Sequence, residues 1–281
     1  MKEDIAPVRG KTTDKTPWEG KCAVKPWDYK ITAVIPVLDT PETVEICVDL
    51  LRLQTEQPYI LIIDTGSQGN ALERIQKLHT DDTEVHFLRL NAVQHPSDFP
   101  AIAMDLAFSL CRTEFIFATH ADCFLRKRTF LEELLSMSQS ISPVVGYEIS
   151  PRKHKDWQGM VSHTATMYHM PTMDKIGFGW SLRRLCNLHN VGDCKPNAKR
   201  PNWPDTEILG NYILREQGIA PHLIGHEKNF SRQIDDNIDH FRSYTSSKLY
   251  NSDYYKQAKE WFEDARIEAI ERIKAWRIDN V

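Results

Sequence analysis

The chain of 281 residues has an ordinary globular composition, with 41% hydrophobic and 26% charged residues. Its formal net charge of −4 argues against the strongly basic surface of a nucleic-acid-binding protein. It contains no run of about 18 apolar residues and no N-terminal apolar segment, so neither a transmembrane helix nor a secretory signal is expected. The six cysteines form no C-x-x-C pair and predict reduced thiols in a cytoplasmic protein.

The first part of the chain changes character near residue 29. Residues 1–28 are rich in Lys, Asp, Thr and Pro without periodicity, and they predict a flexible tail. Beyond them, apolar runs alternate with helical patterns. The expected strands are 31–37, 59–63, 85–90 and 115–118, and the expected helices are 41–53, 70–78, 100–111 and 129–137. This alternation predicts βαβ units, and therefore an α/β fold with a mostly parallel central sheet and flanking helices.

The second half is less regular, with strands expected at 144–149 and 165–169 and a helix at 204–217. Residues 226–247 are polar and predict a long loop, and a final amphipathic helix is expected at 252–277. We therefore expect one α/β domain over residues 29–225. Residues 226–281 then form a C-terminal lid loop and helix.

Polar side chains stand where two expected strands end. Asp64 closes the second strand, and His120 and Asp122 follow the fourth. In parallel sheets of this kind, ligands bind beyond the carboxyl ends of the strands. The pattern therefore predicts a ligand site that includes these residues.

Four segments resemble the family 2 glycosyltransferases, which share the GT-A fold. In chain order they are Ala33-Val34-Ile35-Pro36, Ile62-Ile63-Asp64-Thr65-Gly66-Ser67, His120-Ala121-Asp122 and Trp203-Pro204-Asp205-Thr206-Glu207. The resemblance covers residues 31–225. It implies transfer of a sugar from a nucleotide-sugar donor, a UDP- or GDP-sugar, to an acceptor hydroxyl with inversion.

The resemblance also implies which residues bind the donor. Pro36 and Asp64 are expected at the nucleotide, where a carboxylate offers several hydrogen-bond acceptor sites. Asp122 occupies the last position of the family's D-x-D motif, and implies a divalent ion, Mn²⁺ or Mg²⁺, at the diphosphate. His120 replaces the first aspartate of that motif. It is expected to contact the donor or to ligate an ion such as Mn²⁺, which accepts imidazole better than Mg²⁺ does.

A catalytic base is implied in the last of the four segments. Asp205 stands at the family's base position, from which a carboxylate takes the proton of the acceptor hydroxyl. Glu207 is the alternative base. Pro204 replaces the acidic residue that usually precedes the base, and a carboxylate at a helix start is also favoured by the helix dipole alone.

Two later stretches complete the expected site. Some GT-A enzymes take a further metal ligand from a late histidine, which points to His240, with Arg242 able to reach the diphosphate. His226 competes with His240 for this role. Trp180 follows Gly-Phe-Gly in a segment that the family resemblance assigns to acceptor binding. The Trp180 ring is expected either to stack on a sugar there or to pack in the core.

Three alternatives stay open from the sequence. Replacement of the first motif aspartate by His120 is consistent with a catalytically degenerate GT-A domain that binds a sugar or a partner. Asp64-Thr65-Gly66-Ser67 matches the aspartic-protease signature, although such enzymes need two facing aspartates. Cys186, His189 and Cys194 have partial zinc-ligand spacing without a fourth ligand. The donor sugar, the acceptor and the oligomeric state stay undetermined.

Overall fold

The computed structural model of the protein describes most of the chain in stretches. These are residues 28–81, 85–90, 98–149, 157–180, 208–226, 233–241 and 253–279. The predicted tail over residues 1–28 therefore lies outside the described residues, apart from its last one. None of the helices in these stretches has the length and apolar character that crossing a bilayer requires.

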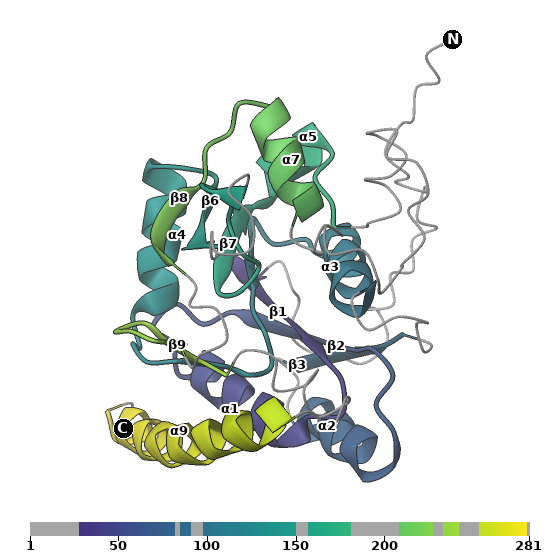
Figure 1. The fold of residues 1–281 in the computed structure, drawn as a ribbon, viewed down its shortest axis with the longest axis vertical. Helices are drawn as coiled ribbons and strands as arrows, with labels where there is room; N and C mark the ends of the chain where they lie inside the picture. The colour runs from purple at the N-terminus through teal and green to yellow at the C-terminus, as the bar shows by residue number, and fades with distance from the viewer. Residues whose placement is uncertain are drawn as a thin grey trace.

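A seven-stranded sheet forms the centre of the molecule (Figure 1). In spatial order its strands are β3 (Val85–Arg89), β2 (Tyr59–Asp64), β1 (Ile31–Val37), β4 (Phe115–Ala118), β7 (Thr166–His169), β6 (Val144–Glu148) and β8 (His222–His226). Neighbouring strands are parallel except where β7 pairs with β4 and with β6. The predicted α/β fold with a mostly parallel sheet is confirmed.

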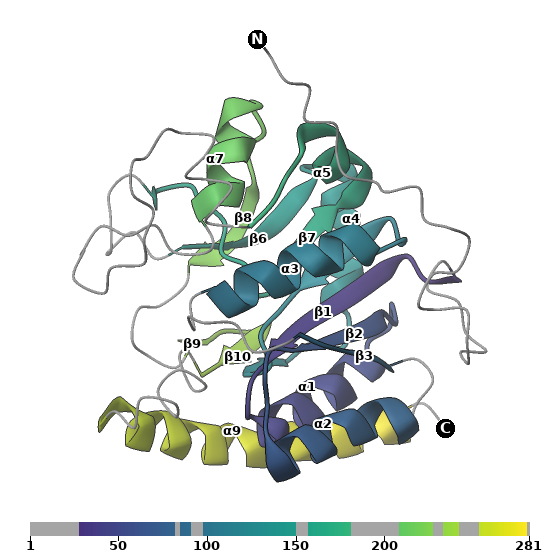
Figure 2. The same cartoon turned by 90° about the vertical axis from the view of Figure 1, so that its right-hand side faces the viewer.

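Helices cover both faces of this sheet, with α3 on one face and α1, α2 and α9 on the other (Figure 2). The helices of the described residues are α1 (Pro41–Arg52), α2 (Gly69–Asp81), α3 (Asp98–Leu110), α4 (Phe130–Ser140), α5 (Met170–Ile176), α7 (Ile208–Glu216) and α9 (Asp253–Ile278). Successive side chains of a strand point to opposite faces, which explains the two layers. Ile31, Ala33 and Ile35 of β1 pack with α1, α4 and α9, whereas Val34 packs with α3 and α5.

A second, smaller sheet joins the middle of the chain to its end. Its strands are β5 (Cys123–Leu125), β10 (Ile238–His240) and β9 (Gln233–Ile234), all antiparallel. The sequence predicted a loop over residues 226–247, and this is wrong for residues 233–234 and 238–240, which form strands. Strands of two or three residues are too short to show a period of two in the sequence, so the pattern gave no signal for them.

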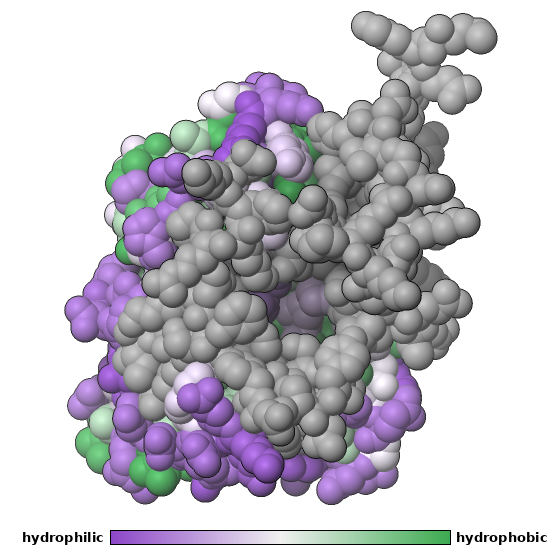
Figure 3. All heavy atoms as spheres, viewed as in Figure 1, coloured by the Kyte–Doolittle hydropathy of each residue, from purple (hydrophilic) through white to green (hydrophobic). Residues whose placement is uncertain are grey.

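The C-terminal helix α9 packs into the main core. The residues that it buries recur at helical spacing: Ala258, Phe262, Ala265, Ala269 and Ile273. The Phe262 ring centroid lies 6.3 Å from that of Phe124 in β5 and 5.9 Å from that of Phe241 after β10. The outer face of α9 is mostly polar, with Ile267 and Ile278 as exposed exceptions. Purple, hydrophilic residues accordingly dominate the lower edge of the molecule, with green patches at the lower left (Figure 3).

Removing the Phe262 ring should show that α9 belongs to the core. We expect Phe262→Ala to lower the free energy of unfolding by about 3–5 kcal/mol, because it leaves a cavity between α9 and the small sheet. Ile267→Ala is the matched control on the same helix, since Ile267 is 59% exposed, and should stay within about 0.5 kcal/mol. Urea unfolding measures both. If both variants change the free energy of unfolding equally and only slightly, α9 does not contribute to the main core.

Candidate metal and donor-binding site

The candidate site lies where β4 ends at the carboxyl edge of the main sheet. His120 and Asp122 are on the short turn that joins β4 to β5. His240 ends β10, and the antiparallel pairing of β10 with β5 makes it the register partner of Cys123. The N–H of Phe241 then donates to the carbonyl of Asp122 over 3.1 Å. This backbone ladder brings His240 beside a turn that is distant in the sequence.

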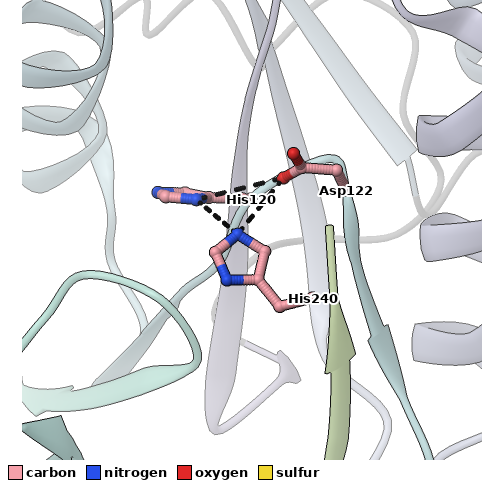
Figure 4. A group of neighbouring side chains, drawn as sticks. All are labelled: His120, Asp122 and His240. Carbon is pink, nitrogen blue, oxygen red and sulfur yellow. Dashed lines mark hydrogen bonds and ion pairs between the residues drawn. The ribbon is translucent and has the colours of Figure 1, made fainter. Parts of the chain in front are cut away.

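The side chains of His120, Asp122 and His240 point toward one another, and we call them the His–Asp–His cluster (Figure 4). Nε2 of His240 lies 3.3 Å from Nδ1 of His120 and 3.5 Å from Oδ1 of Asp122. The remaining pair, His120 Nδ1 and Asp122 Oδ1, is separated by 4.0 Å. Asp122 and His240 are buried, whereas 26% of the His120 side chain is exposed. Among these three side chains, the cluster is therefore most open at His120.

The separations within the His–Asp–His cluster fit a divalent cation. An ion with bonds of about 2.1 Å holds neighbouring ligand atoms about 3.0 Å apart in an octahedron and about 3.4 Å apart in a tetrahedron. The observed 3.3 to 4.0 Å lies at or slightly above these values. Three protein ligands leave positions open for oxygen atoms of a bound molecule. Two imidazoles favour Mn²⁺ over Mg²⁺, which prefers oxygen ligands and retained water.

Two buried thiols support the turn without entering the His–Asp–His cluster. The Cys47 thiol lies 3.7 Å from the carbonyl of His120, to which it donates. Burial, with a smaller contribution from the Asp122 charge, raises the pKa of Cys47 above its ordinary value. Burial also raises the pKa of Cys123. Thiols bind metals as thiolates, so these two are poor competitors of the imidazoles for an ion.

His163 stands beside the His–Asp–His cluster and was missed by the sequence reasoning. Its buried ring lies 4.3 Å from the ring of His120 and 5.4 Å from the ring of Trp180, measured between centroids. It precedes β7, and no motif or spacing marks it. It reaches the site only because β7 pairs with β4 in the sheet, which the sequence does not reveal.

Trp180 is packed among aromatic side chains. Only 1% of it is exposed. Its ring meets those of Phe108, Tyr168 and Phe178 edge-on, at centroid distances of 6.3, 5.7 and 5.5 Å. These contacts account for Trp180 as a core residue. Its expected role in acceptor binding stays a prediction.

Asp64 ends β2 and is fully buried. Its Oδ1 accepts a hydrogen bond from the N–H of Ser67 at 3.1 Å, and its Oδ2 lies 3.5 Å from Nε of Arg89. Arg89 also donates to the Ser67 carbonyl, and its side chain is 40% exposed. Pro36 lies across the β1–β2 pair from Ile63 and is half-buried. Nucleotide binding by Asp64 and Pro36 stays a prediction.

The structure does not describe every residue that the sequence singled out. Those outside the described residues are Asp205, Glu207, Arg242, Cys186, His189 and Cys194. His226 ends β8, where its Nδ1 pairs with the carboxylate of buried Glu148. It does not belong to the His–Asp–His cluster.

A comparison with protein families identifies the family of the chain. The model of the family described as glycosyl transferase family 2 matches residues 32–184, which is more than half of the chain. The chain belongs to glycosyl transferase family 2. The matched residues include the His120–Asp122 turn and also residues 64–67, which resemble the aspartic-protease signature. A search of curated protein sequences returns no significant match.

Solved structures show the fold of this family 2 glycosyltransferase domain. A mannosyltransferase from Pyrobaculum calidifontis, in complex with GDP-Man and Mn²⁺, is 10% identical with a TM-score of 0.51, over 92% of this chain and 77% of that one. Glucosyl-3-phosphoglycerate synthase from Mycobacterium tuberculosis is 10% identical with a TM-score of 0.48, over 73% of each chain. S. aureus TarS 1-349 is 11% identical with a TM-score of 0.43, over 54% of this chain and 50% of its own length. The chain thus spans half of TarS 1-349. The likeness to the mannosyltransferase supports a GT-A fold.

Mn²⁺ alone should bind to the purified family 2 chain. We expect His240→Ala to weaken that binding at least about tenfold, because it removes a buried imidazole ligand. His169→Ala is the matched control: His169 ends β7, which runs antiparallel to β4, so it lies at the opposite edge of the sheet. Electron paramagnetic resonance of free Mn²⁺ during a titration measures both. Equal affinities in the two variants would remove His240 from the site.

Proposed function

We propose that this family 2 enzyme transfers a sugar from a UDP- or GDP-sugar to an acceptor hydroxyl, with inversion and with dependence on Mn²⁺. The observation that carries the proposal is the His–Asp–His cluster at the carboxyl edge of a GT-A sheet. Ligands of such sheets bind at this edge. The solved mannosyltransferase with GDP-Man and Mn²⁺ has the same fold, which supports this class of donor and metal.

In this proposal the chain binds the donor from two sides. His120, Asp122 and His240 would hold a divalent ion near the donor diphosphate, and its positive charge would stabilise the departing nucleoside diphosphate. Asp64 and Pro36 lie at the nucleotide. Arg242 donates charge-assisted hydrogen bonds to the phosphate oxygens.

The chemical step is a direct displacement. The acceptor oxygen forms a bond to the anomeric carbon while the bond from that carbon to the diphosphate oxygen breaks. Asp205 takes the hydroxyl proton, and attack opposite the leaving group inverts the anomeric centre. Glu207 takes the proton instead if the base lies two residues further along the chain.

One observation favours a second candidate, a GT-A domain that binds a sugar or a partner without catalysis. His120 replaces an aspartate of the D-x-D motif, so only one carboxylate remains in the His–Asp–His cluster. The two candidates differ in turnover. Metal-dependent release of nucleoside diphosphate from UDP- or GDP-sugars by the purified protein supports the enzyme, and its absence across the donor panel supports the binding domain.

Nucleoside diphosphate should stabilise the fold only in the presence of Mn²⁺. Without a cation, the diphosphate and Asp122 repel each other. At ligand concentrations 100-fold above Kd, UDP or GDP with Mn²⁺ should add about 2.7 kcal/mol to the free energy of unfolding. Chemical denaturation with and without EDTA measures this, and Asp122→Ala should abolish the metal dependence. Equal stabilisation in EDTA would contradict the metal assignment.

Replacing the base should separate chemistry from binding. Asp205→Asn keeps the shape of the side chain but cannot accept the proton. Turnover should fall by roughly 10²–10⁴-fold, while donor affinity stays within a few-fold. Steady-state release of nucleoside diphosphate and donor titration measure the two quantities. Unchanged turnover in Asp205→Asn, together with loss in Glu207→Gln, would move the base to Glu207.

A further inference from the structure

Residues 157–165 form a short segment between β6 and β7 that has no role in the proposed mechanism. Its backbone is paired with the end of β6. The N–H of Ser162 donates to the carbonyl of Tyr147 at 2.8 Å. The N–H of Ile149 donates to the carbonyl of Met160, also at 2.8 Å. The segment is therefore held like an extra strand rather than as a free loop.

Side chains of α7 and β6 also fix this segment. Buried Asn211 of α7 makes two hydrogen bonds to Val161, donating to its carbonyl at 2.7 Å and accepting from its N–H at 2.8 Å. Buried Glu148 of β6 accepts from the N–H of Gly159 at 2.6 Å. A segment held by a strand, a helix and a buried carboxylate has little freedom to move.

The segment ends in an unfavourable backbone conformation. Ala165 has a φ of 51°, in the left-handed region that residues with a Cβ rarely adopt. Close by, Thr166 donates through its hydroxyl to the carbonyl of Ser162, and the N–H of Thr164 donates to the Ser162 hydroxyl at 3.1 Å. Such conformations persist where the surroundings over-determine the chain, and they cluster at functional sites.

The residue inside this fixed turn is His163, which is only 5% exposed. Its ring contacts that of His120 at 4.3 Å with the planes tilted by 59°, and it meets Trp180 edge-on at 5.4 Å. The backbone of Trp180 is itself anchored, because its main-chain N–H donates to Oδ1 of Asp105 in α3 at 2.7 Å. The His163 ring therefore connects a rigid aromatic core to His120, whose own turn is partly exposed.

We propose that His163 is a positioning residue for the metal site: its ring holds the His120 imidazole with Nδ1 facing His240 and Asp122. Fixing the ring before an ion arrives lowers the entropy cost of binding. Outer residues that orient metal ligands typically contribute 10- to 100-fold to affinity. This inference rests on the proposed function, since it assumes that the His–Asp–His cluster takes up a divalent cation.

The test measures Mn²⁺ affinity in the full chain, by electron paramagnetic resonance, beside thermal stability. His163→Ala should weaken Mn²⁺ binding about 10- to 100-fold. His163→Phe keeps a ring against His120 and should restore affinity to within a few-fold of the wild type. Phe178→Leu is the control, because Phe178 packs on Trp180 at 5.5 Å and belongs to the same aromatic group. It should lower stability and leave Mn²⁺ affinity unchanged.

The outcomes separate this inference from the proposed function. If the wild type binds Mn²⁺ and folded His163→Ala binds it equally well, His163 is a packing residue and the inference is overturned while the metal site stands. If His163→Phe loses as much Mn²⁺ affinity as His163→Ala, loss of the ring contact does not explain the weaker binding. That result also overturns the inference. If the wild type binds no Mn²⁺, the metal assignment fails and the inference fails with it. Should His163→Ala not fold, the comparison of His163→Phe with His163→Leu decides in the same way.

Discussion

The pairing of β5 with β10 is the constraint on which the site depends. Three residue pairs bring His240 beside the turn after β4. A ladder this short has little stability of its own. Its support comes from Phe124 and Phe241, whose rings lie 5.0 Å apart and both contact Phe262 of α9. The end of the chain, far in sequence from the strands that carry the motif, therefore holds the third side chain of the His–Asp–His cluster in place.

The replacement of a motif aspartate by His120 changes the charge of the site. Two carboxylates neutralise a divalent ion, whereas one carboxylate with two neutral imidazoles leaves a charge of about +1 before the donor binds. In the proposed metal site, this charge would attract a diphosphate more strongly and bind the ion less tightly by charge alone. Ion binding would then depend on the geometry of the nitrogen ligands. Imidazole binds metals in its neutral form, so the proposed uptake of an ion would fall as the solution becomes acidic.

The sequence predicted β1 and β4 to the residue, because buried parallel strands are continuous apolar runs flanked by polar residues. It also placed Asp122 at the carboxyl edge of the sheet, since Asp122 follows such a strand, and its role in ligand binding stays a prediction. His240 was named only through the family resemblance and was placed on a solvated loop. It is buried in a strand. His163 was not predicted at all. Both His240 and His163 reach the site through pairings between segments that are distant in the sequence, which the sequence does not reveal.

Asp64 shows a different limit of predicting ligand-binding residues from their position at the ends of strands. The sequence marks it as a nucleotide ligand, yet it is fully buried and lies against Arg89. For Asp64 to bind a base, its Oδ2 must exchange the guanidinium for an N–H of that base. The contact is 3.5 Å long, and Oδ2 accepts no hydrogen bond from the described residues. This is weaker than the bidentate Arg–carboxylate bond, so the exchange costs less than breaking a full ion pair. Arg89 is the exposed partner, so its positive charge lies on the solvent side of the carboxylate.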